Sequence, residues 1–332
     1  DVAPSRGLGD VYKRQFLNTS KQGKFNAYFT DRIAELHATG HIGNSQTYKQ
    51  TQDMLRSYDR KLDQRLFSDI DLRYVRGFDM FLQKRSCCGN TRKFYFKALR
   101  AILNRANAEG VGSVATYPFG RGGFEVSKLE EATAKRYLPA AELSKLKSAT
   151  ANNPQCEYAR KLFLFSYYCY GISFIDMAML TAAHIKQMED GDYIVYKRQK
   201  IKRQKGVKPI SIKITPAIRQ LIESLQAASP TVDDFLLPVV TRSGYTGERL
   251  YMHIRTRYSK YQKYLRLLAE ELGIDFHLTS YVSRHTAAMT LQRNHIPREV
   301  ISQMLGHADL ETTNVYLDSF DNGVINEAAK VL

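Results

Sequence analysis

Apolar side chains recur at helical spacing through the first third of the chain. The first segment places them three or four residues apart, as on one face of a helix, at Phe25, Phe29, Ile33 and Leu36. Gly40 with Gly43 closes this segment. The same spacing predicts three more helices, over about residues 45–62, from Asp69 or Asp71, and from a cap at Asn90 or Thr91. In the last helix the residues expected to face inward are Phe94, Leu99, Ile102 and Leu103.

The second half mixes helices with a short hairpin. Residues 158–180 form a strongly apolar run that predicts a helix. Residues 193–200, rich in β-branched and aromatic types, predict a strand that pairs with residues 209–214. Residues two apart on a strand share a face, so Arg198 and Lys200 would project together. We therefore expect a mainly α fold with a small antiparallel β-sheet.

Near the C-terminus the pattern predicts three short helices. Residues 286–292 suit the first, and Pro297 suits the first turn of a second. That second helix would bury Val300, Ile301, Met304 and Leu305. Gly306 would end it, since glycine accepts the left-handed conformation common at helix ends. Asp309 is a plausible cap for the third, in which Leu310 and Leu317 lie seven apart and can face inward.

Glycine and proline divide the chain into two domains. A helical domain is expected over residues 24–109, a linker over 110–126, a second domain over 127–320 and a short tail over 321–332. Residues 1–15 contain Gly-Asp-Val-Tyr-Lys-Arg-Gln, which resembles a translated sequencing adaptor, and are left out of the fold prediction.

The charge balance indicates a polyanionic partner. The chain has 49 Lys and Arg against 33 Asp and Glu, a net charge of +16, which favours nucleic acid over most alternatives. There is no run of 18 apolar residues, so no membrane segment is expected. Four cysteines without a Cys-x-x-Cys motif suggest neither disulfides nor a zinc site, as in a reduced cytoplasmic protein.

Arg284-His285, Leu305-Gly306-His307 and Tyr316 form an ordered series. Taken singly, a tyrosine is usually a packing residue, a histidine after a helix a dipole partner, and an arginine a solvated charge. In this combination and spacing they resemble the C-terminal signature of the tyrosine recombinases, or phage integrases. The segment Thr-Ser-Tyr-Val-Ser-Arg-His at 279–285, with Phe-Ile-Asp-Met-Ala at 174–178, is similar to segments of the integrases of Bacteroides-type mobile elements. The resemblance covers about residues 24–320.

The resemblance implies a DNA-cutting mechanism and assigns its residues. Tyr316 would attack a phosphodiester to give a 3′-phosphotyrosine and a free 5′-hydroxyl, without metal or other cofactor. Arg284 would hold the phosphate, His307 would hydrogen-bond a non-bridging oxygen, and His285 would support Arg284. Lys200, or alternatively Lys205, would protonate the leaving oxygen.

Two positions depart from the family pattern. Tyr170 stands where most relatives carry the first phosphate-binding arginine, and Arg198 is our candidate to supply that guanidinium instead. Tyr281 stands where many relatives have histidine or lysine, and its phenol can still donate a hydrogen bond to phosphate. His277 is a further possible donor outside the motif.

The resemblance also implies how DNA is held. The first domain would be a SAM-like core-binding domain and the second a mixed α/β catalytic domain. Basic residues on the fourth predicted helix would face the duplex at Arg92, Lys93, Lys97 and Arg100. Double-stranded DNA is the expected partner, bound by a homo-tetramer. A catalytically impaired DNA-binding relative and a relaxing type IB topoisomerase are the alternatives.

Overall fold

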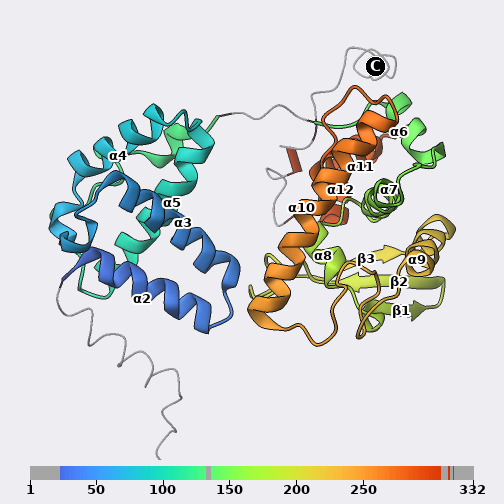
Figure 1. Ribbon diagram of the computed structural model, residues 1–332, viewed down its shortest axis with the longest axis horizontal. Coiled ribbons are helices and arrows are strands. Elements are labelled where there is room, and N and C mark those ends of the chain that lie inside the picture. The colour runs from blue at the N-terminus through green and yellow to red at the C-terminus, as the bar shows by residue number, and fades with distance from the viewer. Residues whose placement is uncertain (1–22, 132–135, 308–312, 315–316, 318–332) are drawn as a thin grey trace, which may run out of the picture. The chain divides into compact units, whose positions relative to one another are not determined.

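The computed structural model describes residues 23–131, 136–307, 313–314 and 317. It divides the chain into two compact units, Asp1–Thr133 and Ala134–Leu332, each with its own hydrophobic core (Figure 1). The prediction of a mainly helical fold with a small antiparallel sheet is confirmed. Residues 1–15, 308–312 and 321–332, for which a leader, a helix cap and a tail were expected, lie outside the described residues.

The first unit contains four α-helices among its described residues. They are α2 (Phe25–Ala38), α3 (Ile42–Tyr58), α4 (Leu72–Lys84) and α5 (Gly89–Ala108). Short 3₁₀ turns flank them at η1 (Leu62–Gln64), η2 (Phe67–Asp69) and η3 (Val126–Leu129). Asp71 caps α4 as its sequence position suggested, because its carboxylate accepts the Tyr74 backbone N–H at 2.8 Å. Gly43 lies inside α3 and therefore does not close the preceding helix.

Helix α5 begins earlier than predicted and buries a different aromatic residue. Its N-cap is Cys88, without a side-chain cap hydrogen bond, and not Asn90 or Thr91. Phe96 is fully buried whereas Phe94 is 37% exposed. Residues two positions apart on a helix lie about 200° apart around its axis. Phe94 therefore cannot share the face that Phe96 and Leu99 turn to the core.

The stretch expected to be a linker packs onto the first unit. Phe119 is buried, and its backbone forms an isolated bridge with Phe124. The Phe124 ring lies 4.4 Å from that of Phe96, centroid to centroid. The glycines and proline of residues 110–126 do produce irregular backbone, but the two phenylalanines among them, Phe119 and Phe124, pack against Phe96 and complete the core of the helices.

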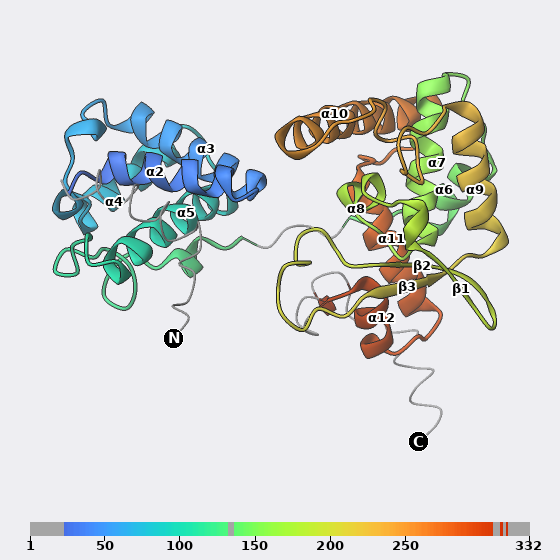
Figure 2. The ribbon, with the colours of Figure 1, turned by 90° about the horizontal axis from the view of Figure 1, so that it is seen from below.

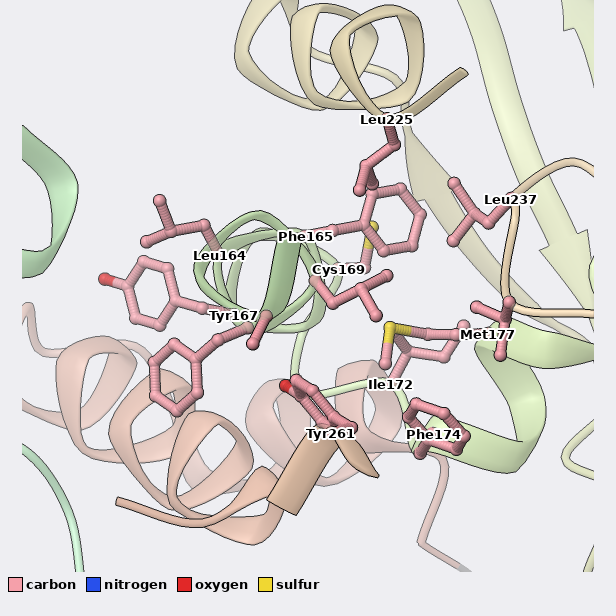
Figure 3. Close-up of a cluster of buried hydrophobic side chains, with 14 of the residues drawn as sticks. Leu164, Phe165, Tyr167, Cys169, Ile172, Phe174, Met177, Leu225, Leu237 and Tyr261 are labelled. Atoms are coloured by element: carbon pink, nitrogen blue, oxygen red, sulfur yellow. The ribbon is translucent and has the colours of Figure 1, made fainter. Parts of the chain in front are cut away.

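The second unit surrounds one central helix. Its described helices are α6 (Ala140–Ser148), α7 (Pro154–Tyr168), α8 (Phe174–Ala178), α9 (Pro216–Ala228), α10 (Gly247–Glu271), α11 (Ser280–Arg293) and α12 (Arg298–Leu305). Helices α9, α10 and α11 all contact α7. Figure 3 shows apolar side chains of α7 meeting those of neighbouring elements, with Phe165 beside Leu225 and Leu237. This packing gives α11 a rigid support.

The predicted apolar helix over residues 158–180 is broken in the middle. Helix α7 ends at Tyr168, and Tyr170 and Gly171 follow with positive φ angles of 56° and 72°. The Ser173 side chain then accepts the Asp176 backbone N–H and starts α8. A pattern of apolar residues cannot reveal this break, because both helices are buried.

The sheet has three antiparallel strands, of which the sequence predicted two. They are β1 (Ile185–Met188), β2 (Gly191–Tyr196) and β3 (Ile210–Lys213), in the order β1-β2-β3. Tyr196 pairs with Ile210, and this pair is the last of the ladder. The predicted strand therefore stops before Arg198 and Lys200, which lie in the β2–β3 loop. Helix α12 lies beside β3 (Figure 2).

Helix α12 ends where predicted and begins one residue after Pro297, which was expected in its first turn. Pro297 is its N-cap, and Gly306 ends it in the left-handed conformation with φ 63° and ψ 44°. Ile301 and Leu305 are fully buried, as expected, but Val300 is 44% exposed. Its position one residue before Ile301 turns it about 100° away from the buried face.

Candidate active site

Arg284 joins three separate segments of the second unit. It lies on α11 and is only 4% exposed. Its Nη1 donates to the Gly171 carbonyl oxygen at 3.0 Å, and its Nη2 donates to that of Leu305 at 2.5 Å. The α7–α8 turn, α11 and the end of α12 thus meet at one guanidinium, whose plane is fixed before any ligand arrives.

His307 lies against the same guanidinium. Arg284 Nη2 is 2.9 Å from His307 Nε2, and His307 Nδ1 is 2.7 Å from the Thr313 hydroxyl oxygen. The left-handed Gly306 turns the chain so that the histidine follows directly after the buried end of α12. The sequence predicted that Arg284 and His307 act together, and the structure brings these two side chains together.

Arg198 approaches the site from the β2–β3 loop. Its Nη1 donates to the Gly306 carbonyl oxygen at 3.2 Å, next to His307. The following residue is fixed as well, because the buried Asp176 carboxylate accepts the Gln199 backbone N–H at 2.6 Å. Asp176 also accepts the Ser173 hydroxyl at 2.6 Å. The base of the loop is therefore held to α8, although strand pairing ended at Tyr196.

A cavity of about 380 Å³ opens beside these groups. Arg198, Arg284 and Tyr281 all line it, together with residues of α8 and α10. Tyr281 is 56% exposed, and its ring lies 5.2 Å from that of His285, centroid to centroid. The remaining lining residues are Gly171, Ile172, Ser173, Phe174, Ile175, Tyr251, Ile254, Arg255, Tyr258 and Ser280. Three guanidinium groups on one cavity form a surface suited to phosphate.

The predicted lysines and the off-motif histidine lie elsewhere on the surface. Lys200 and Lys205 are exposed in the β2–β3 loop and do not line this cavity. His277 is exposed and lines a different hollow near Arg266 and Glu270. The structure thus brings Arg284, His307 and Arg198 together and leaves both lysines on the loop outside the cavity.

Tyr170 turns toward the protein interior. It is half-buried against the core of the second unit and is not among the residues lining the cavity. Burial raises the pKa of its phenol, so the side chain stays neutral at physiological pH. Tyr170 therefore cannot contribute the positive charge of an arginine. Ser173, three residues later, lines the cavity instead.

Two glycines allow the arginines to approach so closely, and the sequence pattern predicts the role of only one of them. A Cβ added to Gly171 would lie 2.4 Å from Arg284 Cα, and one added to Gly306 would lie 2.3 Å from Ile210 Cδ1 and 3.3 Å from Arg198 Cδ. Gly306 is predicted as a helix end. Gly171 follows Tyr170, the position where most relatives carry the first phosphate-binding arginine, and that position was the signal that could have indicated it.

Gly171→Ala is expected to lower DNA cleavage by about 10- to 100-fold with a smaller effect on DNA binding. The new methyl group would meet the Arg284 backbone at a residue already in the left-handed region, so α11 would have to move. Single-turnover cleavage and a mobility-shift titration measure the two effects. Gly244→Ala is the matched control, since that glycine also has positive φ but open space around it. Equal losses in both variants would contradict the proposed contact.

Tyr316 itself lies outside the described residues, but described residues flank it. Thr313 is fully buried, and Leu317 is 2% exposed. Leu317 packs with Ile301 and Leu305 in a small apolar cluster that α11 and α12 form. The chain on both sides of position 316 is thus packed against α11, which carries Arg284, and α12, after which His307 follows.

The basic residues of α5 differ in their availability. Arg92 pairs with Asp79 at 2.9 Å and Lys93 with Glu130 at 2.7 Å, and their side chains are 18% and 15% exposed. Lys97 and Arg100 are exposed. The sequence pattern predicts the same role for all four residues. Its periodicity cannot show which of them an acidic side chain of another element will pair with.

Family models match both units of the chain. The phage integrase SAM-like domain matches residues 24–125, and the phage integrase family matches residues 136–322, more than half of the 332 residues. The chain belongs to the phage integrase family, the tyrosine recombinases, which cleave and rejoin DNA through a tyrosine.

Individual proteins share part of the sequence or the fold of this chain. Tyrosine recombinase XerD of Halalkalibacterium halodurans is 41% identical over 54 residues, which are 16% of this chain and 18% of that protein. The XerH site-specific recombinase bound to a palindromic difH substrate is similar in fold, with 18% identity, 99% and 91% of the two chains covered, and a TM-score of 0.63. The Tn1549 transposon integrase in complex with a circular intermediate DNA gives 13% identity, 93% and 99% coverage, and a TM-score of 0.62.

The described parts of the chain hold neither a cluster of metal-binding side chains nor a helix that could cross a membrane. There, no three His, Cys, Asp or Glu side chains gather closely enough to hold a metal ion. No helix in those parts is both long and apolar enough to cross a membrane.

Proposed function

We propose that this protein is a site-specific DNA recombinase that cuts and rejoins double-stranded DNA through a 3′-phosphotyrosine at Tyr316. The observation that carries the proposal is the convergence of Arg284, Arg198 and His307 beside one cavity. A phosphodiester becomes open to attack when its developing negative charge is held, and planar guanidinium groups match phosphate oxygens in pairs.

The proposed chemistry needs only the residues of this chain. The Tyr316 oxygen attacks phosphorus, the bond to the 5′ oxygen breaks, and the phosphotyrosine link keeps the bond energy for rejoining. A phenol normally ionises near pH 10, so the positive charges around the phosphate must assist its deprotonation. Arg284 and Arg198 supply that charge, with His307 beside them. His285, the next residue on α11, would help to hold Arg284 in place without contacting the phosphate.

A general acid must protonate the departing 5′ oxygen. We assign this role to Lys200, with Lys205 as the alternative, because both lie on the loop whose base is fixed beside the arginines. Tyr281 takes the place of the family's histidine or lysine as a hydrogen-bond donor to phosphate. Its exposure at the rim of the cavity supports this assignment.

The first unit adds contacts to the DNA backbone. Lys97 and Arg100 are the exposed candidates on α5, and Arg92 and Lys93 would first have to leave their carboxylate partners. We further propose that the protein acts as a homo-tetramer on DNA, because recombination joins two duplexes with four strand cuts. We also propose that it originates from a Bacteroides-type mobile element.

A nicked suicide substrate tests the proposal. The nick lets the short 5′-hydroxyl strand diffuse away after cleavage, so a covalent protein–DNA complex accumulates and can be seen on a denaturing gel. The DNA site can be found first by sequencing DNA that remains attached to the denatured protein in expressing cells. Absence of any covalent product would leave a DNA-binding relative, and relaxation without recombinant product would leave a topoisomerase.

Arg198→Ala is expected to slow covalent complex formation by about 10² to 10³, the usual effect of removing one preorganised donor to a developing charge. Single-turnover cleavage of the suicide substrate measures it. Arg203→Ala is the matched control, because Arg203 is exposed in the same loop and lines a different hollow. A near wild-type rate for Arg198→Ala would remove this arginine from the site.

A further inference from the structure

Thr313 makes a contact that none of the assigned roles explains. Its hydroxyl oxygen is 2.7 Å from His307 Nδ1, and the side chain is fully buried. It lies six residues after His307 and three before Tyr316. Thr313 is therefore the described residue that links the segment bearing the nucleophile to a ring at the phosphate site.

The contacts of His307 decide which of its nitrogens carries the proton. Arg284 Nη2 lies 2.9 Å from Nε2, and a guanidinium can only donate. Nε2 must therefore accept, which leaves the hydrogen of the neutral ring on Nδ1. That nitrogen then donates to the Thr313 hydroxyl. Both contacts require the same tautomer, so they reinforce each other.

We propose that Thr313 is a positioning residue that holds His307 in the Nδ1–H tautomer and keeps Nε2 directed at Arg284. This inference rests on the proposed function, because it concerns how the same site is assembled. With Nε2 as an acceptor, the neutral ring can take the phenol proton of Tyr316 at that nitrogen when Arg284 turns its Nη2 hydrogen to the phosphate, and it donates to a phosphate oxygen only after that proton has arrived. The hydroxyl of Thr313 thus sets the direction in which His307 can transfer a proton.

The matched variants are Thr313→Val and Thr313→Ser. Valine keeps the shape of threonine but removes the oxygen that accepts the His307 Nδ1–H, whereas serine keeps the hydroxyl. Thr313→Val should slow covalent complex formation by roughly 10- to 100-fold, and Thr313→Ser should remain within about threefold of the wild type. DNA affinity in a mobility-shift titration should change little in either variant.

A spectroscopic measurement separates the tautomer from general loss of structure. Long-range ¹H–¹⁵N correlation spectra of protein labelled at histidine distinguish protonated from unprotonated ring nitrogens, and the His307→Gln variant assigns the signal. The wild type and Thr313→Ser should show protonated Nδ1 and bare Nε2 for His307, and Thr313→Val should shift toward a mixture. Thr51→Val is the control, because Thr51 is also fully buried but its hydroxyl donates to a helix carbonyl in the first unit.

The outcomes distinguish the two proposals. If the wild type forms no covalent complex, the proposed function fails, whereas the tautomer of His307 can still be measured. If the wild type cleaves and Thr313→Val cleaves equally well with an unchanged His307 spectrum, the role of Thr313 is overturned. A loss in Thr313→Val that serine does not rescue would also overturn it, since the hydroxyl would then not be the cause.

Discussion

Replacing Tyr316 with phenylalanine should abolish covalent complex formation, with a rate loss on the order of 10⁴ to 10⁶. Phenylalanine keeps the ring but lacks the oxygen that would attack phosphorus, so the phosphotyrosine at position 316 cannot form. DNA binding should remain within about threefold of the wild type, because the phosphate-holding residues Arg284, Arg198 and His307 are unchanged. A denaturing gel with the nicked substrate and a mobility-shift titration measure the two properties.

The control for this variant is Tyr48→Phe, which removes a phenol from a half-buried tyrosine of the first unit. It should form covalent complex at the wild-type rate. A Tyr316→Phe protein that still becomes attached to DNA would mean that another residue is the nucleophile. The mass of the DNA-linked peptide would then identify that residue.

Arg284→Lys should lower cleavage by about 10³-fold or more, although charge is conserved. The arginine donates to the Gly171 and Leu305 carbonyl oxygens and contacts His307, and a lysine ammonium cannot reach all three while also holding phosphate. Buried carbonyls left without donors add a cost to folding of about 1–3 kcal/mol each. Single-turnover cleavage and thermal unfolding of the free protein measure the two consequences.

Arg293→Lys provides the control on the same helix. Arg293 is exposed, lies over the Tyr137 ring at 5.1 Å, and keeps its charge on substitution. Cleavage should stay within about twofold of the wild type. If Arg284→Lys cleaved as well as Arg293→Lys, the fork of Arg284 would not be what holds the phosphate.

Local sequence signals identified the ends of two helices, although the cap expected at Asn90 or Thr91 and the helix end expected at Gly43 were wrong. Gly306 identified the end of α12, and Asp71 the start of α4, because glycine and aspartate act within a few residues of their own positions. Val300 and Phe94 were assigned to cores and are exposed, because neighbouring apolar residues compete for the same face and only the partner helices decide between them.

The site shows the same division between local and distant effects. The spacing of Arg284, His307 and Tyr316 can be read from one stretch of chain. Arg198 was proposed from strand alternation, but β2 ends at Tyr196, and the arginine lies near the site because Gly306 lacks a side chain. The contributions of Gly171, Asp176 and Thr313 could not be predicted, since each depends on a segment that is remote in sequence or on a backbone turn.

The anchor at Gln199 separates the two candidate acids by their freedom of movement. The Cα of Lys200 lies about 3.8 Å from the Cα of Gln199, the residue whose backbone N–H donates to Asp176. Lys205 is six residues from that anchor and could travel up to about 20 Å along an extended chain. The backbone of Lys200 would therefore stay close to α8 before the duplex arrives, whereas Lys205 would be brought to the site by the duplex itself. If Lys205 is the acid, strand cleavage would require DNA that is already bound correctly. Selection of the DNA site would then precede the chemical step.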